Sequence, residues 1–93
     1  MNEKQIEQAI KRNIRAAPDS FVVKIHADGT QGRNTLDLVG AYRGVPFWVD
    51  VKTPDGGVSL VQRGLIRRCR ACGYVSGAVS SWDAFKALFD HAE

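Results

Sequence analysis

Hydrophobic residues recur along the chain with two different periods, and these periods predict an order of helices and strands. Residues 3 to about 16 carry isoleucines at every fourth position, which predicts an amphipathic helix that ends at Pro18. These isoleucines are Ile6, Ile10 and Ile14. Residues 21–26 are rich in β-branched side chains and predict a strand, whereas the polar, glycine-containing residues 27–34 predict a loop.

The central segment, residues 35–52, predicts two antiparallel strands joined by a tight turn at Arg43-Gly44. With the turn centred there, residues whose numbers add up to 87 face each other, so Asp37 lies opposite Asp50. Because side chains alternate between the two faces of a strand, Asp50 and Lys52 share one face. The other face takes the apolar residues Leu36, Leu38, Phe47, Val49 and Val51.

The second half of the chain predicts a helix, a strand and a last helix. Residues 54–57, Pro-Asp-Gly-Gly, predict the turn that ends the third strand. A helix of about 14 residues then runs from Ser59 to near Gly73, because a glycine suits a helix C-terminus. Its expected apolar side consists of Leu60 or Val61, Leu65, Cys69 and Cys72.

Residues 74–79 predict a fourth strand, which should run parallel to the third because a helix connects the two. Ser80-Ser81 cap the last helix, in which apolar residues recur at helical spacing. These are Trp82, Phe85, Leu88 and Phe89. The predicted fold class is therefore α/β, in the form of an α+β mixed sheet with the order helix, three strands, helix, strand and C-terminal helix.

Length and composition place limits on this picture. The 93 residues suffice for one small domain, so residues 1–93 are expected to form a single unit. A hydrophobic content of 44% with 25% charged residues is typical of a globular domain that folds without disulfides. The sequence shows neither a signal region nor the roughly 18 apolar residues of a membrane span, so we expect a cytoplasmic location and no membrane partner. The net charge of +3 favours anionic partners such as nucleic acid.

The facing acids carry the candidate chemistry. Directly opposed residues have Cβ atoms roughly 5 Å apart, and like charges at that distance destabilise a sheet. A divalent cation with oxygen ligands between Asp37 and Asp50 would remove the repulsion, and Lys52 could offset charge or activate a nucleophile. The alternative is a solvated polar face on which Lys52 pairs with either aspartate.

Two flanking residues have both a functional and a structural interpretation. Glu7 borders the isoleucine stripe and could reach over the sheet towards the acids, one turn after Glu3. It could equally form a pair with Lys11 and add favourable charge near a helix N-terminus. Gln62 lies three positions after Ser59, which is the spacing of a capping box, or it could point from the first helical turn towards the acids.

In this order and spacing, the elements and motifs resemble the PD-(D/E)xK nuclease superfamily. More narrowly, they resemble stand-alone VRR-NUC (virus-type replication-repair nuclease) domains of phages and prophages. The resemblance spans roughly residues 3 to 80 and implies a restriction-endonuclease-like αβββαβ core. The matching residues are an early glutamate in the first helix, Lys24, Gly32, Leu36-Asp37, Trp48–Pro54, Gly56-Gly57 and Leu60-Val-Gln62. The chain departs from the pattern with Leu36, where a proline often precedes the first acid, and with Asp50, where this family usually has glutamate.

The resemblance implies a metal-dependent DNA endonuclease that hydrolyses phosphodiester bonds. Asp37, Asp50 and the backbone carbonyl of Val51 would hold Mg²⁺ or Mn²⁺, with Glu7 or else Glu3 contributing directly or through water. Lys52 would position or deprotonate the attacking water. Gln62 would orient the lysine, the water or a phosphate oxygen. No small-molecule cofactor is expected.

DNA phosphates are the expected partners of four basic residues, Lys24, Arg33, Arg63 and Arg67. The resemblance also implies a homodimer that acts on branched or Holliday-junction-like DNA in a bacterial host, encoded by a phage or prophage. Two alternatives remain open, which are a catalytically inactive DNA-binding module of the same fold and a structural or partner-interaction domain. A sequence-specific restriction-type endonuclease would need a target-recognition region for which the chain is short.

Overall fold

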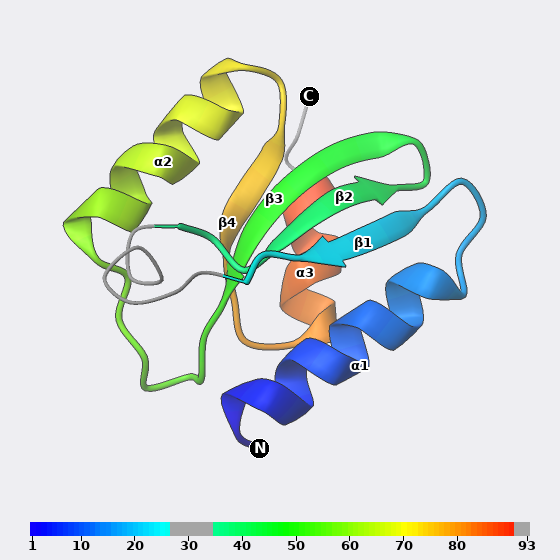
Figure 1. Cartoon of the computed structure of the whole chain (residues 1–93), viewed down its shortest axis with the longest axis horizontal. Coiled ribbons are helices and arrows are strands. Elements are labelled where there is room, and N and C mark those ends of the chain that lie inside the picture. The colour runs from blue at the N-terminus through cyan, green and yellow to red at the C-terminus, as the bar shows by residue number, and fades with distance from the viewer. Residues whose placement is uncertain (27–34, 91–93) are drawn as a thin grey trace.

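The computed structural model of the chain describes residues 1–26 and 35–90. In these residues, three helices and four strands follow one another in the predicted order, which confirms the α+β fold with an αβββαβ core and a C-terminal helix (Figure 1). The elements are α1 (Glu3–Arg15), β1 (Phe21–Lys24), β2 (Leu38–Tyr42), β3 (Val45–Val51), α2 (Leu60–Ala71), β4 (Val75–Val79) and α3 (Trp82–Asp90).

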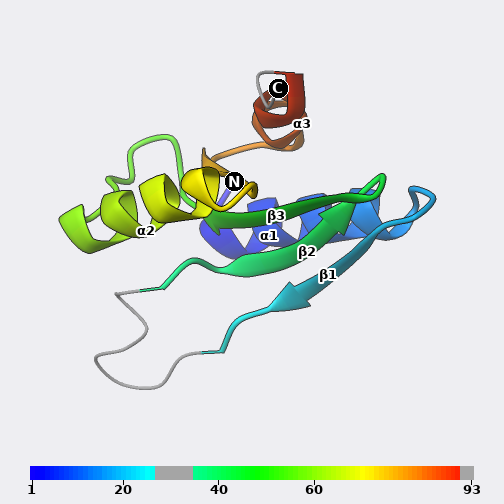
Figure 2. The same cartoon turned by 90° about the horizontal axis from the view of Figure 1, so that it is seen from above.

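The four strands form one mixed sheet in the order β1-β2-β3-β4. The first two pairings are antiparallel, and Figure 2 shows β1, β2 and β3 side by side in this order. The pairing of β3 with β4 is parallel, because the chain crosses from one to the other through α2. This arrangement confirms the predicted direction of the fourth strand.

The register of the central hairpin is the predicted one. Leu38 faces Val49 and Gly40 faces Phe47, so the residue numbers of each pair add up to 87. Arg43 and Gly44 both have positive φ angles, of 50° and 79°, which is the backbone of a type I′ turn. Such a turn matches the twist of the two strands, and glycine adopts its second position without strain.

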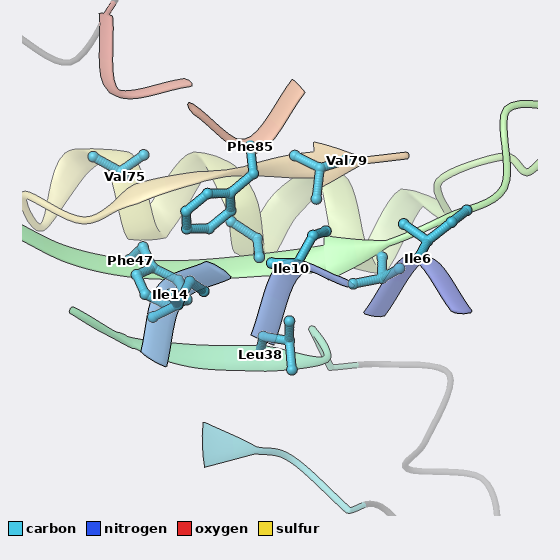
Figure 3. Close-up of a cluster of buried hydrophobic side chains, with 10 residues drawn as sticks. Ile6, Ile10, Ile14, Leu38, Phe47, Val75, Val79 and Phe85 are labelled. Carbon is cyan, nitrogen blue, oxygen red and sulfur yellow. The ribbon is translucent and has the colours of Figure 1, made fainter. Parts of the chain in front are cut away.

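The helices cover the sheet in two layers with separate apolar clusters. Helices α1 and α3 share the larger cluster with the side chains that alternate inward from β2, β3 and β4. Figure 3 shows the α1 isoleucines and Phe85 of α3 meeting over these strands. The buried residues of this cluster are Ile6, Ile10, Ile14, Leu38, Phe47, Val49, Val51, Val75, Val79 and Phe85.

The smaller cluster lies under α2 on the opposite face, and it corrects the predicted position of Leu36. Leu36 packs there with Ile66 and Cys69, next to Trp48, rather than with Val49 and the other inward residues of the hairpin. The prediction assumed strand alternation back to residue 35. Regular pairing begins only at Leu38, so the preceding residues are free of that alternation.

The predicted apolar side of α2 is wrong in part. Leu60 and Val61 are 83% and 54% exposed, and Cys72 is exposed as well. The residues that face the sheet are Gln62, Ile66 and Cys69, with Leu65 half-buried. Several apolar stripes fit this helix equally well by periodicity. The observed rotation buries Ile66 and Cys69 against Leu36 and turns Gln62 towards the sheet.

The ends of α2 and α3 agree with the predicted caps. The Ser59 hydroxyl accepts a hydrogen bond from the backbone N–H of Gln62, and the Ser81 hydroxyl accepts one from Ala84. Gly73 follows α2 with a φ of 92°. Among residues 1–26 and 35–90, none of the helices has both the length and the hydropathy that crossing a membrane would require.

Candidate active site

A pocket of about 320 Å³ lies where the open end of the β2–β3 hairpin meets the start of α2. It brings together four of the predicted site residues, Asp37, Asp50, Lys52 and Gln62. The remaining lining comes from Glu3, Gly57 and Ser59. Residues that are 25 positions apart in the sequence thus share one concave surface.

Asp37 is fixed at the point where its chain enters β2. Its Oδ2 accepts a hydrogen bond of 2.8 Å from the backbone N–H of Val51, on the strand that carries Asp50. Its own carbonyl oxygen accepts a 2.8 Å hydrogen bond from the N–H of Ile25. The first aspartate is therefore held against the backbone next to the second, just beyond the last regular pair of the hairpin, Leu38–Val49.

Asp50 is a buried carboxylate that lacks hydrogen-bond partners. The residue is 1% exposed, and its Oδ2 accepts no hydrogen bond from any described residue. The ammonium of Lys52 lies 3.1 Å from this oxygen, so the pair is in ionic contact without hydrogen-bond geometry. Burial, followed by the charge and hydrogen bonding of Asp37, raises the pKa of Asp50 to about 7, and Lys52 opposes this shift.

Gln62 completes the predicted capping box, and the other end of its amide reaches the segment that leads to Asp37. Its Oε1 accepts a 3.2 Å hydrogen bond from the N–H of Ser59, which completes the capping box. Its Nε2 donates a 3.2 Å hydrogen bond to the carbonyl of Thr35, two residues before Asp37. The side chain is 5% exposed and lines the pocket, so the first turn of α2 is tied to the segment that carries the first aspartate.

The two glutamates of α1 lie in different surroundings. Glu3 lines the pocket, whereas the carboxylate of Glu7 is held by two lysines. Lys24 donates a hydrogen bond to Oε1 of Glu7, and Lys11 lies 3.6 Å from Oε2. The Lys24 ammonium is also 3.8 Å from Oδ1 of Asp37, so it lies between the helix and the site.

The ammonium of Lys24 stays charged in this position. Burial lowers its pKa, but the hydrogen bond to Glu7 and the charge of Asp37 outweigh burial and raise the pKa above its usual value. The side-chain nitrogen of Lys24 thus lies against the carboxylates of Glu7 and Asp37. Arg63 and Arg67 are exposed on α2, and Arg33 lies outside the described residues.

Sequence reasoning did not identify Thr35, Ser59 and Gly57 as parts of the site. Thr35 contributes only its carbonyl, which any residue would provide, so no sequence signal marks it. Ser59 and Gly57 come from the turn and the cap before α2. Their place beside the pocket follows from the short connection between β3 and α2.

The donor set fits a hard divalent cation such as Mg²⁺. Among the described residues, no group of three or more His, Cys, Asp or Glu is placed to hold a metal ion. Mg²⁺ sites that act on phosphates commonly use one or two carboxylates and fill the remaining positions with water and substrate oxygens. Asp37 and Asp50 supply two carboxylates, and the unpartnered Oδ2 of Asp50 is a buried acceptor that such an ion would satisfy. Val51, whose carbonyl is the third predicted ligand, lies between Asp50 and Lys52 at the end of β3.

Comparison with known proteins does not assign the chain to a family. No protein-family model matches the chain, and no curated protein matches it, so its function is argued from the geometry of the pocket.

Proposed function

We propose that the chain is a metal-dependent DNA endonuclease of the PD-(D/E)xK superfamily, similar to the VRR-NUC domains. One observation carries the proposal: Asp37, Asp50, Lys52 and Gln62 line one pocket, and a buried carboxylate oxygen there lacks a hydrogen-bond partner. A structural domain with a merely polar surface would gain nothing from this arrangement, because an unsatisfied buried carboxylate destabilises the fold.

The two aspartates, together with the carbonyl of Val51, would hold Mg²⁺ or Mn²⁺. An ion bound there supplies a Lewis acid that polarises the scissile phosphodiester. Asp37 is oriented for this role by its hydrogen bond from Val51, and Asp50 by its burial. Glu3 lines the same pocket and is placed to add a carboxylate directly or through water.

Lys52 provides the positive charge beside the reacting phosphate. Its ammonium touches Asp50 and lines the pocket, where it would position the attacking water and neutralise charge that develops on the phosphate oxygens. The water oxygen forms the new bond to phosphorus, and the bond from phosphorus to the leaving sugar oxygen breaks. Gln62 has both ends of its amide in hydrogen bonds, so its contribution is to hold the segment of Asp37 in place.

The substrate preference and assembly follow from the resemblance to VRR-NUC domains. We expect branched DNA, such as a Holliday junction, to be cut by a homodimer that brings one site to each of two strands. A bacterial cytoplasm that contains phage or prophage DNA is the matching location. Sedimentation should then give about twice the 10.2 kDa mass of one chain, whereas the mass of a single chain would contradict the dimer.

A cleavage assay tests the proposed activity. Labelled linear duplex, flap and four-way junction DNA are incubated with the protein, with and without Mg²⁺ or Mn²⁺. We expect cleavage that depends on the metal and is lost in Asp37→Ala and in Lys52→Ala. Asp83→Ala is the matched control, because Asp83 is an exposed carboxylate on α3, away from the pocket.

The possible outcomes separate the alternatives. Cleavage that survives Asp37→Ala would show that another site, or a contaminant, performs the reaction. Tight DNA binding with no cleavage in either metal would instead identify a catalytically inactive DNA-binding module. Absence of both binding and cleavage would leave a structural or partner-interaction domain.

A further inference from the structure

A second pocket lies beside the candidate active site, between α2 and β4. It has a volume of about 300 Å³, and two of its lining residues, Val58 and Arg63, directly follow Gly57 and Gln62 of the active-site pocket. Its walls consist of three arginines from α2 and small or apolar residues from both elements. The lining residues are Val58, Arg63, Ile66, Arg67, Arg70, Gly77 and Ala78. We call this pocket the α2–β4 groove.

The positive charge of the protein is concentrated along this groove. Helix α2 contains four arginines and no acidic residue, while the whole chain has a net charge of +3. The rest of the chain therefore has a net charge of −1. Arg63, Arg67 and Arg70 follow the spacing i, i+4, i+7, which places them on one side of the helix, and all three line the groove.

One of these arginines is held in place by the sheet. The Nε of Arg70 donates a 3.0 Å hydrogen bond to the carbonyl of Ser76 in β4. In the described part of the chain, β4 is an edge strand, so this carbonyl lies on the free side of the sheet. The guanidinium of Arg70 thus bridges helix and strand, and the remaining N–H donors of the group stay available to a ligand.

We propose that the α2–β4 groove binds the sugar-phosphate backbone of a DNA strand that continues from the active-site pocket. This inference rests on the proposed function, because it assumes that DNA is the substrate. Phosphate is the chemistry that matches three arginines without an acidic neighbour on their helix. The small, exposed side chain of Ala78 leaves room for a backbone to approach the strand.

The length of the groove sets how much DNA it can hold. A helix rises about 1.5 Å per residue, so the arginines from 63 to 70 extend over roughly 10 Å. One DNA strand advances about 3.4 Å per nucleotide along the duplex axis, so this distance corresponds to about three nucleotides. Because Gln62 and Arg63 are neighbours, these nucleotides would directly flank the scissile phosphate on one side.

Two variants of the same helix provide the test. Arg67→Gln removes a charge from the groove, whereas Arg68→Gln removes the same charge from an exposed arginine that does not line it. Binding of labelled duplex and four-way junction DNA is measured by fluorescence anisotropy over a range of salt concentrations, in EDTA so that no cleavage occurs. Both side chains are exposed, and circular dichroism verifies that each variant is folded.

We expect Arg67→Gln to bind DNA roughly fivefold more weakly and to lower the slope of log K against log salt by about one. Arg68→Gln should stay within about twofold of the unchanged protein. Equal weakening by both variants, or no weakening by either, would overturn the groove proposal. A polyglutamate chain that displaces DNA at equal charge concentration, in the unchanged protein but not in Arg67→Gln, would assign the groove to an acidic protein instead.

The DNA-binding test of the groove and the cleavage assay can succeed or fail independently of each other. If the Arg67 and Arg68 variants differ as expected but Mg²⁺ and Mn²⁺ give no cleavage, the groove stands and the nuclease activity fails. If cleavage requires Asp37 while the two arginine variants behave alike, the activity stands and the groove fails. Absence of DNA binding by the unchanged protein would contradict both.

Discussion

At the scale of single residues, Asp50 gives the clearest physical sign of a functional site. A carboxylate that is 1% exposed and has an unpartnered oxygen lowers the stability of the fold when it is ionised. The neighbouring Asp37 adds repulsion, and Lys52 compensates only in part. Residues held in such an unfavourable state are typical of sites where a ligand supplies the missing interaction.

Asp50→Asn should therefore stabilise the protein at neutral and higher pH. The pKa of Asp50 is about 7 in the folded state and near 3.8 in the unfolded state. Between these values the folded state binds more protons than the unfolded state, so stability falls as the pH rises from about 4 to 7 and stays low above that. The amide cannot ionise, so its advantage should reach the order of 4 kcal/mol at pH 8 and nearly vanish at pH 4.

Urea unfolding of both proteins at pH 4 and pH 8 measures this difference. Comparing the two proteins at the same pH cancels the contribution of the titrating groups that do not interact with Asp50. A loss of stability in Asp50→Asn at pH 8 would contradict the account, because it would mean that the charged carboxylate has stabilising partners.

Glu7 and Lys24 allow a test of whether Glu7 is a metal ligand or acts through the lysine. Both oxygens of Glu7 are paired with lysines, and Lys24 also reaches Asp37. In Glu7→Gln, Lys24 should turn fully to Asp37 and compete with a metal ion, so Mn²⁺ binding weakens. The double variant Glu7→Gln, Lys24→Met should then recover most of the lost affinity. A direct ligand role predicts no recovery, and calorimetric titration with Mn²⁺ distinguishes the two.

At the scale of secondary-structure elements, the hairpin was predictable and the rotation of α2 was not. The turn at Arg43-Gly44 and the alternation of side chains determine the register up to the pair Leu38–Val49, which places Asp37 close to Asp50. The hydrogen bond from the Val51 N–H then fixes the Asp37 carboxylate there. The contacts of α2 are long-range, and its apolar residues are spread around the helix. In the structure, Ile66 and Cys69 pack against Leu36, and Gln62 donates a hydrogen bond to Thr35, and periodicity reveals neither contact.

The same difference between local and long-range contacts decides which residues of the candidate site could be predicted from the sequence. Asp50 lies in β3, and Asp37 and Lys52 directly adjoin the paired strands β2 and β3, so sequence spacing brings them together. The positions of Glu3 and Glu7 depend instead on how α1 is placed over the sheet. Sequence spacing favoured Glu7 as the acid near the site, but in the structure Glu3 lines the pocket and Glu7 pairs with Lys24.

Gln62 should couple the start of α2 to the site beyond its role as a helix cap. Ser59→Ala removes the hydroxyl that accepts from the backbone N–H of residue 62. Gln62→Ala leaves that bond in place but removes the reciprocal bond from the Ser59 N–H, together with the anchor on Thr35. Both variants should lose about 1 kcal/mol of stability, as is common for a lost cap. Only Gln62→Ala should weaken Mn²⁺ binding, by roughly tenfold, because metal sites depend on such supporting contacts. Equal metal affinities in the two variants would confine Gln62 to capping.

At the scale of the whole molecule, most of the hydrophobic core lies on one face of the sheet, and the helix next to the candidate site covers the other face. Helices α1 and α3 enclose the larger cluster on one face, where Phe85 stacks with Trp82 and meets Phe47 edge-on. On the other face, α2 covers the smaller cluster and brings its basic side chains next to the acidic pocket. The pocket that we propose for a cation and the groove that we propose for phosphate thus adjoin each other at Gln62 and Arg63.

The central claim of this account is that Asp37 and Asp50 share one divalent cation. Titration with Mn²⁺, followed by the electron paramagnetic resonance signal of the free ion, counts sites and measures affinity without any DNA. We predict one bound Mn²⁺ per chain and a loss of about tenfold or more in affinity in Asp37→Asn, with no change in the control Asp83→Asn. Failure of the unchanged protein to bind Mn²⁺, or equal binding by the two variants, would contradict the claim.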